Sequence, residues 1–322
     1  IRNANANKTI LSGDIGTREL DTDNSYHIMI IAGLTNAADS VIIDGFQFVW
    51  GKAVGSGTRP YNTFSIPRNA GGGLVLWSNA NAGKIQIRNC IFSANRADDI
   101  GGAYYSSASS ATVVNCQFSG NLANYGGAMG NIASSNTRIV NSTFSGNRAG
   151  QSGGAIRNST STPTLINSII YGNNSAISNN TSTTSISYSL VQDFSGTSSG
   201  NTDVSGNLYG TMYNPLFIYE INPNLAPALA GDFKVNLISP IINEGTTVAE
   251  NTISSVDLGG NIRISDGKID MGAYENFCDA PTTIYVDNSR TVSGNGYSWS
   301  DAFKNLTDAL ALAQSCIQVN TI

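Results

Sequence analysis

Acidic residues, which a polysaccharide-cleaving enzyme would need for catalysis, are scarce in the regular central part of the chain. Between residues 84 and 175 the only carboxylates belong to Asp98 and Asp99, which stand just before Gly101. A glycoside hydrolase needs two carboxylates about 5–10 Å apart, and a lyase needs a metal-neutralised acid together with a base. Adjacent residues of an extended chain point to opposite sides, so these two are a poor catalytic pair. The sequence favours an Asx-type turn here.

Two further sets of side chains have types that could perform chemistry. His27, the single histidine, sits in the alternating segment 24–30, where a structural role is favoured over catalysis. Asp257, Asp266 and Asp270 lie in a Gly-rich segment and could hold calcium, although capping of turns is the expected role. We therefore assign no catalytic residue and no cofactor, and a non-enzymatic function is favoured.

The composition narrows the class of protein. Of the 322 residues only 12% are charged, the net charge is −5, and 34 are Gly, while Asn, Ser and Thr supply the polarity. Such a chain lacks the basic face that nucleic acids require. No apolar stretch approaches the roughly 18 residues of a membrane-spanning helix. The abundance of turn-forming and hydroxyl residues predicts strands and turns rather than helices.

A phrase repeated at a fixed interval is the strongest structural signal. The copies NCIFSANRA, NCQFSGNLA, NSTFSGNRA and NSIIYGNNS each begin 26 residues after the last, at Asn89, Asn115, Asn141 and Asn167. A period of this length is typical of stacked structural units. A sandwich with accidental internal similarity is the alternative, and four copies in one register argue against it.

Each copy describes two short strands that meet at a bend. Asn tolerates the left-handed backbone that a tight bend requires, and its amide can bond the same residue one coil away. An aromatic or aliphatic residue follows three positions later. We predict structural ladders along the long axis formed by Asn89, Asn115, Asn141 and Asn167 and by Phe92, Phe118 and Phe144.

A second marker, Gly-Gly-Ala, follows the phrase at Gly101, Gly126 and Gly153. Paired glycines permit a tight turn, and the alanine suits a crowded interior. Residues 44–48 and 71–74 are similar to earlier, degraded copies of the two markers. Three short strands and three turns use about two dozen residues and close one coil, with coils about 4.8 Å apart. The predicted fold is an all-β parallel β-helix of about 26 residues per coil.

The four cysteines show no CxxC pattern, so a zinc site is not expected. Cys90 and Cys116 occupy equivalent inward positions on adjacent coils, where a disulfide and two buried free thiols are equally compatible with the spacing. Cys278 and Cys316 bracket the C-terminal segment, and for an extracellular chain a bridge between them is favoured.

The quoted motifs resemble those of known families. The FSGN-x-A…GGA pattern, over roughly residues 40–190, resembles the repeats of polymorphic outer-membrane proteins and of bacterial right-handed β-helix surface proteins. The stretch NPLF, GDF, SPIINEG, DLGGNIR and IDMGAYE, from Asn214 to Glu275, resembles the closing segment of the choice-of-anchor β-helix proteins of Bacteroidetes. The resemblance implies a right-handed β-helix at the cell surface and export by the type IX system.

The C-terminal segment resembles the opening of a further module. Residues 283–287 read as a strand, and Ser300 is a plausible N-cap of an amphipathic helix. The apolar residues at helical spacing are Ala302, Phe303, Leu306, Leu310 and Ala313. In the resembled family such a strand and helix cap the first coil.

The order of these segments predicts a tandem array. Residues 1–277 would form most of one module, with regular coils over about 84–192 and a closing segment over about 207–277. Residues 278–322 would begin the next module.

The function expected from these observations is that of a non-catalytic extracellular or cell-surface protein: an adhesin, stalk or filament, linked by the resemblance to gliding or attachment. Its expected partners are neighbouring modules, surface glycans and other surface proteins. Two alternatives stay open. One is a secreted polysaccharide lyase or glycoside hydrolase that draws acidic residues from the irregular loops 50–70 and 193–232. The other is a sheath or filament module that binds only its own kind.

Overall fold

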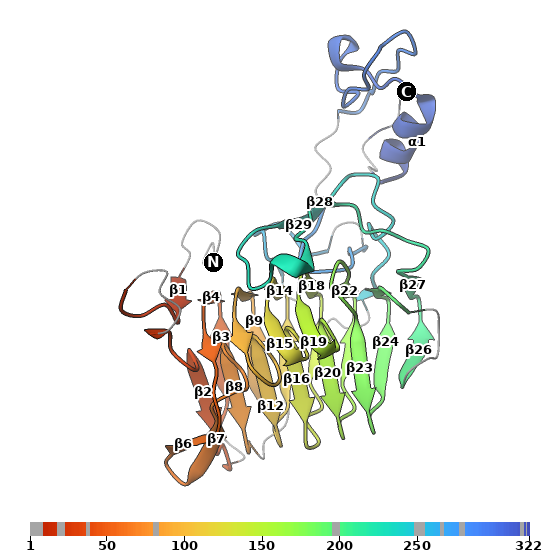
Figure 1. Ribbon diagram of the computed structural model, residues 1–322. Helices are drawn as coiled ribbons and strands as arrows, with labels where there is room; N and C mark the ends of the chain where they lie inside the picture. The colour runs from red at the N-terminus through yellow and green to blue at the C-terminus, as the bar shows by residue number, and fades with distance from the viewer. Residues whose placement is uncertain are drawn as a thin grey trace.

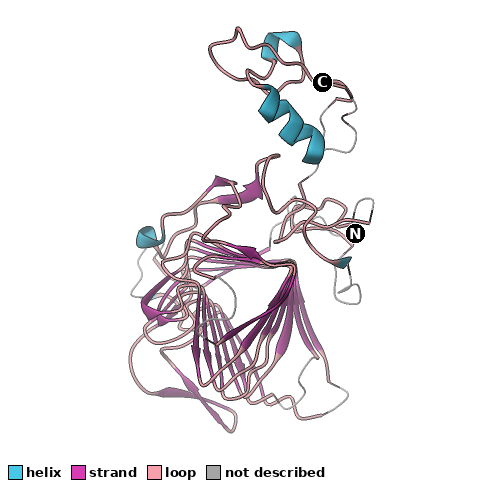
Figure 2. Ribbon diagram, turned by 90° about the vertical axis from the view of Figure 1, so that its right-hand side faces the viewer, coloured by secondary structure: helices cyan, strands magenta, loops and turns pink. Residues whose placement is uncertain are grey.

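Three long parallel sheets run along the stack of coils, and a shorter fourth sheet covers part of it. The computed structural model describes residues 9–17, 23–36, 39–79, 84–194, 200–247, 255–264, 267–276, 281–315, 319 and 321–322. A full coil places one strand in each of three long sheets, here called B, C and A in chain order, and some coils add a short strand to a fourth, sheet D. Figure 1 shows the strands side by side along the axis, and Figure 2 shows the roughly triangular section that the long sheets enclose.

The sheets share a parallel register from one coil to the next. Sheet A contains β1 (Thr9–Ser12), β4 (Phe46–Val49), β10 (Ile91–Ser93), β14 (Gln117–Ser119), β18 (Thr143–Ser145), β22 (Ile169–Ile170), β25 (Leu190–Val191) and β27 (Leu208–Tyr209). Sheet B contains β2 (Met29–Ala32), β8 (Leu74–Trp77), β12 (Tyr104–Ser107), β16 (Met129–Ile132), β20 (Ile156–Ser159) and β23 (Ile177–Asn180).

The other two sheets complete each coil. Sheet C contains β3 (Val41–Asp44), β9 (Ile85–Arg88), β13 (Ala111–Val114), β17 (Arg138–Val140), β21 (Thr164–Ile166), β24 (Thr184–Ser187) and β26 (Asn201–Ser205). Sheet D contains β5 (Lys52–Ala53), β11 (Arg96–Ala97), β15 (Leu122–Tyr125) and β19 (Arg148–Ser152). The predicted parallel β-helix is confirmed, and its coils extend from β1 to β27, beyond the regular repeats on both sides.

The repeat markers form the bends of the coils. Asn89, Asn115, Asn141 and Asn167 all have positive φ, between 46° and 58°, as the tight bend between sheets C and A requires. The first glycine of each Gly-Gly-Ala also has positive φ. At the second glycine, a Cβ would collide with backbone oxygens of the next coil, and the alanine that follows is fully buried. Neither glycine can therefore be replaced without strain.

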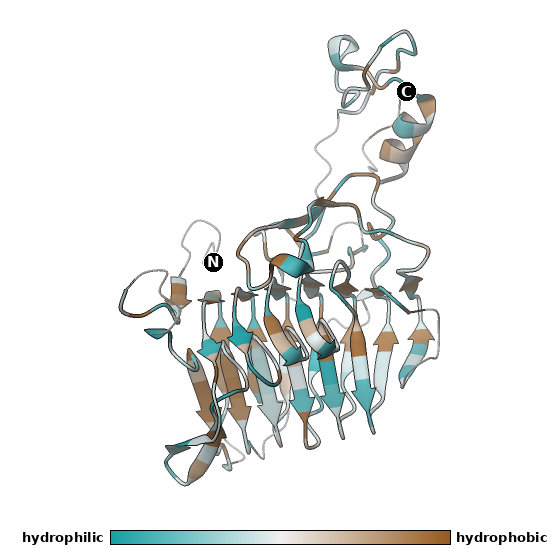
Figure 3. Cartoon of the chain, viewed as in Figure 1, coloured by the Kyte–Doolittle hydropathy of each residue, from teal (hydrophilic) through white to brown (hydrophobic). Residues whose placement is uncertain are grey.

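The degraded copies occupy the predicted register. Phe48 pairs with Phe92, and Leu74 pairs with Tyr104, so residues 44–48 and 71–74 belong to the coil before the first regular one. Figure 3 shows that the hydrophobic colouring of β2 and β8 gives way to hydrophilic colouring in β16 and β20. The stack therefore changes from an aliphatic to an amide-rich interior along sheet B.

The closing segment lies along the side of the stack. It contains β28 (Phe217–Tyr219), the short 3-10 helix η2 (Pro223–Leu225) and β29 (Asp232–Val235), with β28 and β29 antiparallel. The backbone N–H of Ala228 donates to Gly120 O at 2.9 Å, and that of Gly272 donates to Asn167 O at 2.7 Å. The segment thus runs back over the bends of earlier coils (Figure 1). A separate antiparallel hairpin, β6 (Thr58–Tyr61) and β7 (Phe64–Pro67), extends from the N-terminal coils.

The C-terminal segment differs from the expectation in two respects. Residues 283–287 form isolated bridges to Phe303 and Thr321 rather than a strand. Ser300 lies inside the 3-10 helix η4 (Trp299–Asp301), and α1 spans Leu306–Ser315, so Ser300 is not its N-cap.

The buried face of α1 also differs from the prediction. Ala309 and Leu312 pack with Ile284, whereas Leu306 and Leu310 are exposed. The apolar spacing counted from Ala302 fails because Ala302 and Phe303 precede the helix and do not share its periodicity.

Candidate functional site

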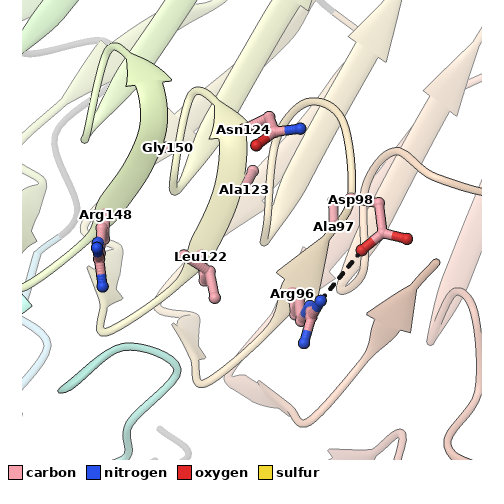
Figure 4. A pocket seen from close by; sticks show the side chains of 8 residues that line it. All are labelled: Arg96, Ala97, Asp98, Leu122, Ala123, Asn124, Arg148 and Gly150. Atoms are coloured by element: carbon pink, nitrogen blue, oxygen red, sulfur yellow. Dashed lines mark hydrogen bonds and ion pairs between the residues drawn. The ribbon is translucent and has the colours of Figure 1, made fainter. Parts of the chain in front are cut away.

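A surface groove lies over sheet D, where three consecutive coils present their short strands. It has a volume of about 340 Å³ and is lined by Arg96, Ala97, Asp98, Leu122, Ala123, Asn124, Arg148 and Gly150. Figure 4 shows Asn124 and Gly150 on the later parts of β15 and β19, on one side of the groove. Every lining residue belongs to the repeated phrase or directly follows it in the sequence.

The lining residues take their positions from the register of sheet D. Arg96 pairs with Leu122, and Leu122 pairs with Arg148, so the three side chains lie in a row along the axis. Ala97 and Ala123 alternate with them and are buried, together with Ala53. Because strand side chains alternate, the small residues face inward and the Arg–Leu–Arg row faces the groove.

Asp98 supplies the only carboxylate of the groove lining, and both of its oxygens are occupied. Oδ1 lies 3.3 Å from Arg96 Nη2, and Oδ2 accepts a hydrogen bond from the backbone N–H of Gly55 at 2.9 Å. Asp98 therefore holds the loop of the preceding coil, which corrects the expectation of a local Asx-type turn. The long-range bond forms because the stacking brings Gly55 beside Asp98.

Asp99 does not join Asp98 as a catalytic partner. It is absent from the groove lining, and partial burial raises its pKa. Its charge contributes to the raised pKa of Tyr105, about 12, for which burial is the main cause. The two carboxylates serve different neighbours, as the alternation of side chains along an extended chain predicts.

His27 has a structural environment. It precedes β2 instead of lying within a strand, and its Nδ1 is 3.0 Å from Gly71 O. Burial lowers its pKa, so the neutral imidazole is favoured. His27 is not among the groove-lining residues.

The aromatic ladder is present as a continuous stack inside the coils. The ring centroids of Phe48 and Phe92 are 4.6 Å apart, those of Phe92 and Phe118 are 4.7 Å apart, and those of Phe118 and Phe144 are 4.6 Å apart. The planes differ by no more than 6°. The stack repeats at the spacing of the coils, as in-register parallel strands require.

The asparagine ladder at the bends is only partly formed. Asn115 Nδ2 donates to Asn89 Oδ1 at 2.6 Å, as expected. Asn167 Nδ2 instead donates to Thr246 O at 2.8 Å, and Asn141 Nδ2 contacts Asp270 O at 3.5 Å. These amides are diverted because the closing segment covers the later bends.

A second asparagine ladder, which was not predicted from the sequence, runs without interruption through four coils. It consists of the Asn that ends each phrase: Asn95, Asn121, Asn147 and Asn173. Each amide donates to the next along the stack, over 3.2, 2.9 and 2.9 Å, and all four residues are buried. Its signal was the second invariant Asn of the phrase, six residues after the first.

Cys90 and Cys116 are free, buried thiols, so the bridge that the spacing allowed is not formed. Each thiol donates to the carbonyl two residues before it, Cys90 to Arg88 O at 3.1 Å and Cys116 to Val114 O at 3.3 Å. Stacked parallel strands hold Cβ atoms one coil spacing apart, which exceeds the usual Cβ separation in a disulfide. Burial raises the pKa of the Cys116 thiol, which makes this thiol unreactive.

The other predicted bridge joins Cys278 and Cys316, and both residues lie outside the described part of the chain.

A buried ionic cluster joins the closing segment to the coils. The Arg263 guanidinium is fully buried; its Nη1 donates to Glu275 Oε1 at 2.8 Å, and its Nη2 contacts Asn115 Oδ1. Asp257 accepts from the backbone N–H of Asn261 at 2.6 Å. Asp270 accepts from those of Asn243 and Asn276 at 2.7 and 2.6 Å. The carboxylates of both aspartates thus accept hydrogen bonds from backbone N–H groups in turns of the closing segment. Asp266 lies outside the described residues.

The crowding of carboxylates in this cluster predicts a pH dependence. Burial raises the pKa of Asp270 to about 6, and burial with the charge of Asp270 raises that of Glu275 to about 8. Both values exceed those of an unfolded chain, near 4. The folded protein therefore binds more protons between about pH 4 and pH 8, and the free energy of unfolding should fall as the pH rises through this window.

We expect the free energy of unfolding, measured in urea, to fall by several kcal/mol between pH 5 and pH 8. Glu275→Gln should flatten the upper half of that profile. Glu244→Gln, which changes an exposed glutamate of the same segment, is the matched control. A Glu275→Gln profile as steep as that of the wild type would contradict the assignment.

Comparison with known proteins agrees with this architecture. The family described as the right-handed β-helix region matches residues 38–207, more than half of the chain. The matched range contains every residue that lines the groove. No curated protein matches the chain. Among the described residues, no helix combines the length and apolar character needed to cross a membrane.

Proposed function

The chain belongs to the right-handed β-helix family, and from this premise we propose that it is a non-catalytic extracellular or cell-surface repeat protein, a rigid rod that contacts glycans through the sheet D groove. The groove itself carries the proposal. It offers two guanidinium groups, an apolar side chain and an amide, which are groups that bind polar polymers. Its one carboxylate is already bonded to Arg96 and to Gly55.

The rod character follows from the internal ladders. Stacked phenylalanines and bonded asparagines tie each coil to the next, so a bend of the axis would break several buried contacts together. A rigid rod with a lateral binding groove suits an adhesin or a stalk. The resemblance of the closing segment to choice-of-anchor proteins supports surface attachment, type IX export, a bacteroidete source and tandem modules as parts of the same proposal.

Within the groove, an enzymatic role would depend on Asp98, because this is the one carboxylate of its lining. An inverting or retaining glycosidase would need a second carboxylate about 5–10 Å away. The lining residues include none. Assay of the purified protein on a panel of polysaccharides, with release of reducing ends and of unsaturated products as readouts, tests the proposal. Turnover of any polymer would overturn the non-catalytic assignment.

The substitution Asp98→Asn distinguishes a binding site from a catalytic site, because it should strengthen binding in the first case and abolish activity in the second. The amide oxygen can still accept the bond from Gly55, while Arg96 loses its carboxylate partner and the groove loses its negative charge. We expect no turnover in either protein and a several-fold tighter binding of acidic polysaccharide by the variant, measured by calorimetry. An enzyme that uses Asp98 would instead lose most of its activity in this variant.

A further inference from the structure

From the row of side chains on sheet D, we infer that the groove is a binding site for an acidic polysaccharide that runs parallel to the axis, with one acidic group on every second sugar. This inference rests on the proposed function and names its ligand class and the residues that select it. The residues concerned are Arg96, Leu122 and Arg148, with Lys52 at the end of the row.

The local charge of this strip is opposite to that of the protein. The chain carries a net charge of −5, yet Lys52 and Arg96 face each other in register on neighbouring strands, and Arg148 follows two coils later. Like charges in register on adjacent strands are destabilising. Asp98 offsets the charge of Arg96, and a polyanion along the row would offset that of Arg148 as well.

Arg148 is the clearest member of the site. Its neighbour Arg96 has Asp98 as a partner, but within the described part of the chain the Arg148 guanidinium has no carboxylate or hydrogen-bond acceptor. The side chain is half-buried in the groove wall. A half-buried guanidinium binds carboxylates and sulfates through paired, charge-assisted hydrogen bonds.

The spacing of the two guanidinium groups selects the polymer. Arg96 and Arg148 are two strands apart in register, which places them about 10 Å apart along the axis. Two pyranose units of an extended polysaccharide have a similar length, so acidic groups on alternate sugars would meet both. An extended acidic peptide presents same-side groups only about 7 Å apart, which fits this spacing poorly.

Leu122 completes the match between the charged positions. It is partly exposed and lies between the two arginines in the row. Its apolar surface can pack against the C–H face of the uncharged sugar. Asn124, which is exposed on the same strand β15, offers an amide to the hydroxyl groups of that sugar (Figure 4).

The experiment measures the affinity of the full chain for three defined polymers. Oligosaccharides of hyaluronan carry a carboxylate on every second sugar, those of polygalacturonate carry one on every sugar, and dextran carries none. We expect hyaluronan to bind most tightly and dextran not to bind at this site. Binding should weaken by more than tenfold as NaCl rises from about 0.05 M to about 0.5 M.

Variants locate the site. Arg148→Ala should weaken hyaluronan binding about tenfold, and Arg148→Lys should retain most of it. Arg138→Ala, which removes the same charge from sheet C, is the matched control and should bind like the wild type. Circular dichroism checks that each variant is folded.

The outcomes separate this inference from the proposed function. Binding of dextran or of another neutral glycan that Arg148→Ala leaves unchanged would overturn the acidic site and leave the glycan-binding rod intact. Binding of acidic peptides in preference to every polysaccharide would overturn the ligand class. Failure to bind any glycan would overturn both proposals.

Discussion

Replacement of Asn121 by alanine is expected to destabilise the protein by about 3–5 kcal/mol. Asn121 is fully buried in the continuous asparagine ladder. Its Oδ1 accepts from the backbone N–H and from Nδ2 of Asn95, at 3.0 and 3.2 Å, and its Nδ2 donates to Phe92 O and Asn147 Oδ1. Alanine would leave the buried backbone N–H of Asn95 without its acceptor and would leave Asn95 Nδ2 with only Phe48 O. Each lost bond costs about 1–3 kcal/mol, and a small cavity adds to the destabilisation.

The measurement is equilibrium unfolding in urea, followed by circular dichroism. Asn124→Ala is the matched control, because Asn124 lies three residues away on the same coil and is exposed. Its effect should stay within about 0.5 kcal/mol. Equal effects of the two substitutions would show that the ladder does not hold the coils together.

Replacement of Phe118 by alanine is expected to cost about 4 kcal/mol. The ring is fully buried between Phe92 and Phe144, at centroid distances of 4.7 and 4.6 Å. The substitution removes two ring stacks and opens a cavity at the centre of the solenoid, where neighbouring coils contact only one another. Because stability propagates coil by coil, we also expect a broader unfolding transition as the two halves of the stack uncouple.

Phe118→Leu distinguishes loss of the stack from loss of volume. Leucine keeps most of the buried apolar volume, and its cost should be about 1–1.5 kcal/mol. Urea unfolding of both variants, with the slope of the transition compared, provides the test. An alanine variant that unfolds at the wild-type midpoint with the wild-type slope would refute the stacking argument.

The fold was predictable because its constraints are local and repeated. An asparagine at each bend, a phenylalanine three residues later and a Gly-Gly-Ala turn define one coil, and identical coils satisfy one another when they stack. The aliphatic and degraded coils before residue 84 were harder to assign, although Phe48 and Leu74 take the predicted register. The second ladder was missed because both asparagines of the phrase repeat equally, and sequence spacing does not say which amide points inward.

The candidate site was predictable only in part. Asp98 and Asp99 were recognised as a poor catalytic pair from their adjacency, and the structure gives them separate neighbours. The row of Arg96, Leu122 and Arg148 was present in the phrase, one residue after its second Asn, but the leucine in the middle copy concealed it. These three residues can act together as a binding site only because the register of sheet D brings three coils into one groove.

The period, the parallel stacking and the aromatic ladder can be derived from the sequence alone, because each depends on residues a few positions apart that repeat at one interval. The path of the closing segment back along the bends is visible only in the folded protein, where the segment diverts Asn141 and Asn167 and buries Arg263 against Asn115. The same holds for the buried face of α1 and for the groove over sheet D. These features arise from single contacts between residues that are distant in the sequence. Such contacts do not repeat, so a periodic sequence pattern cannot predict them.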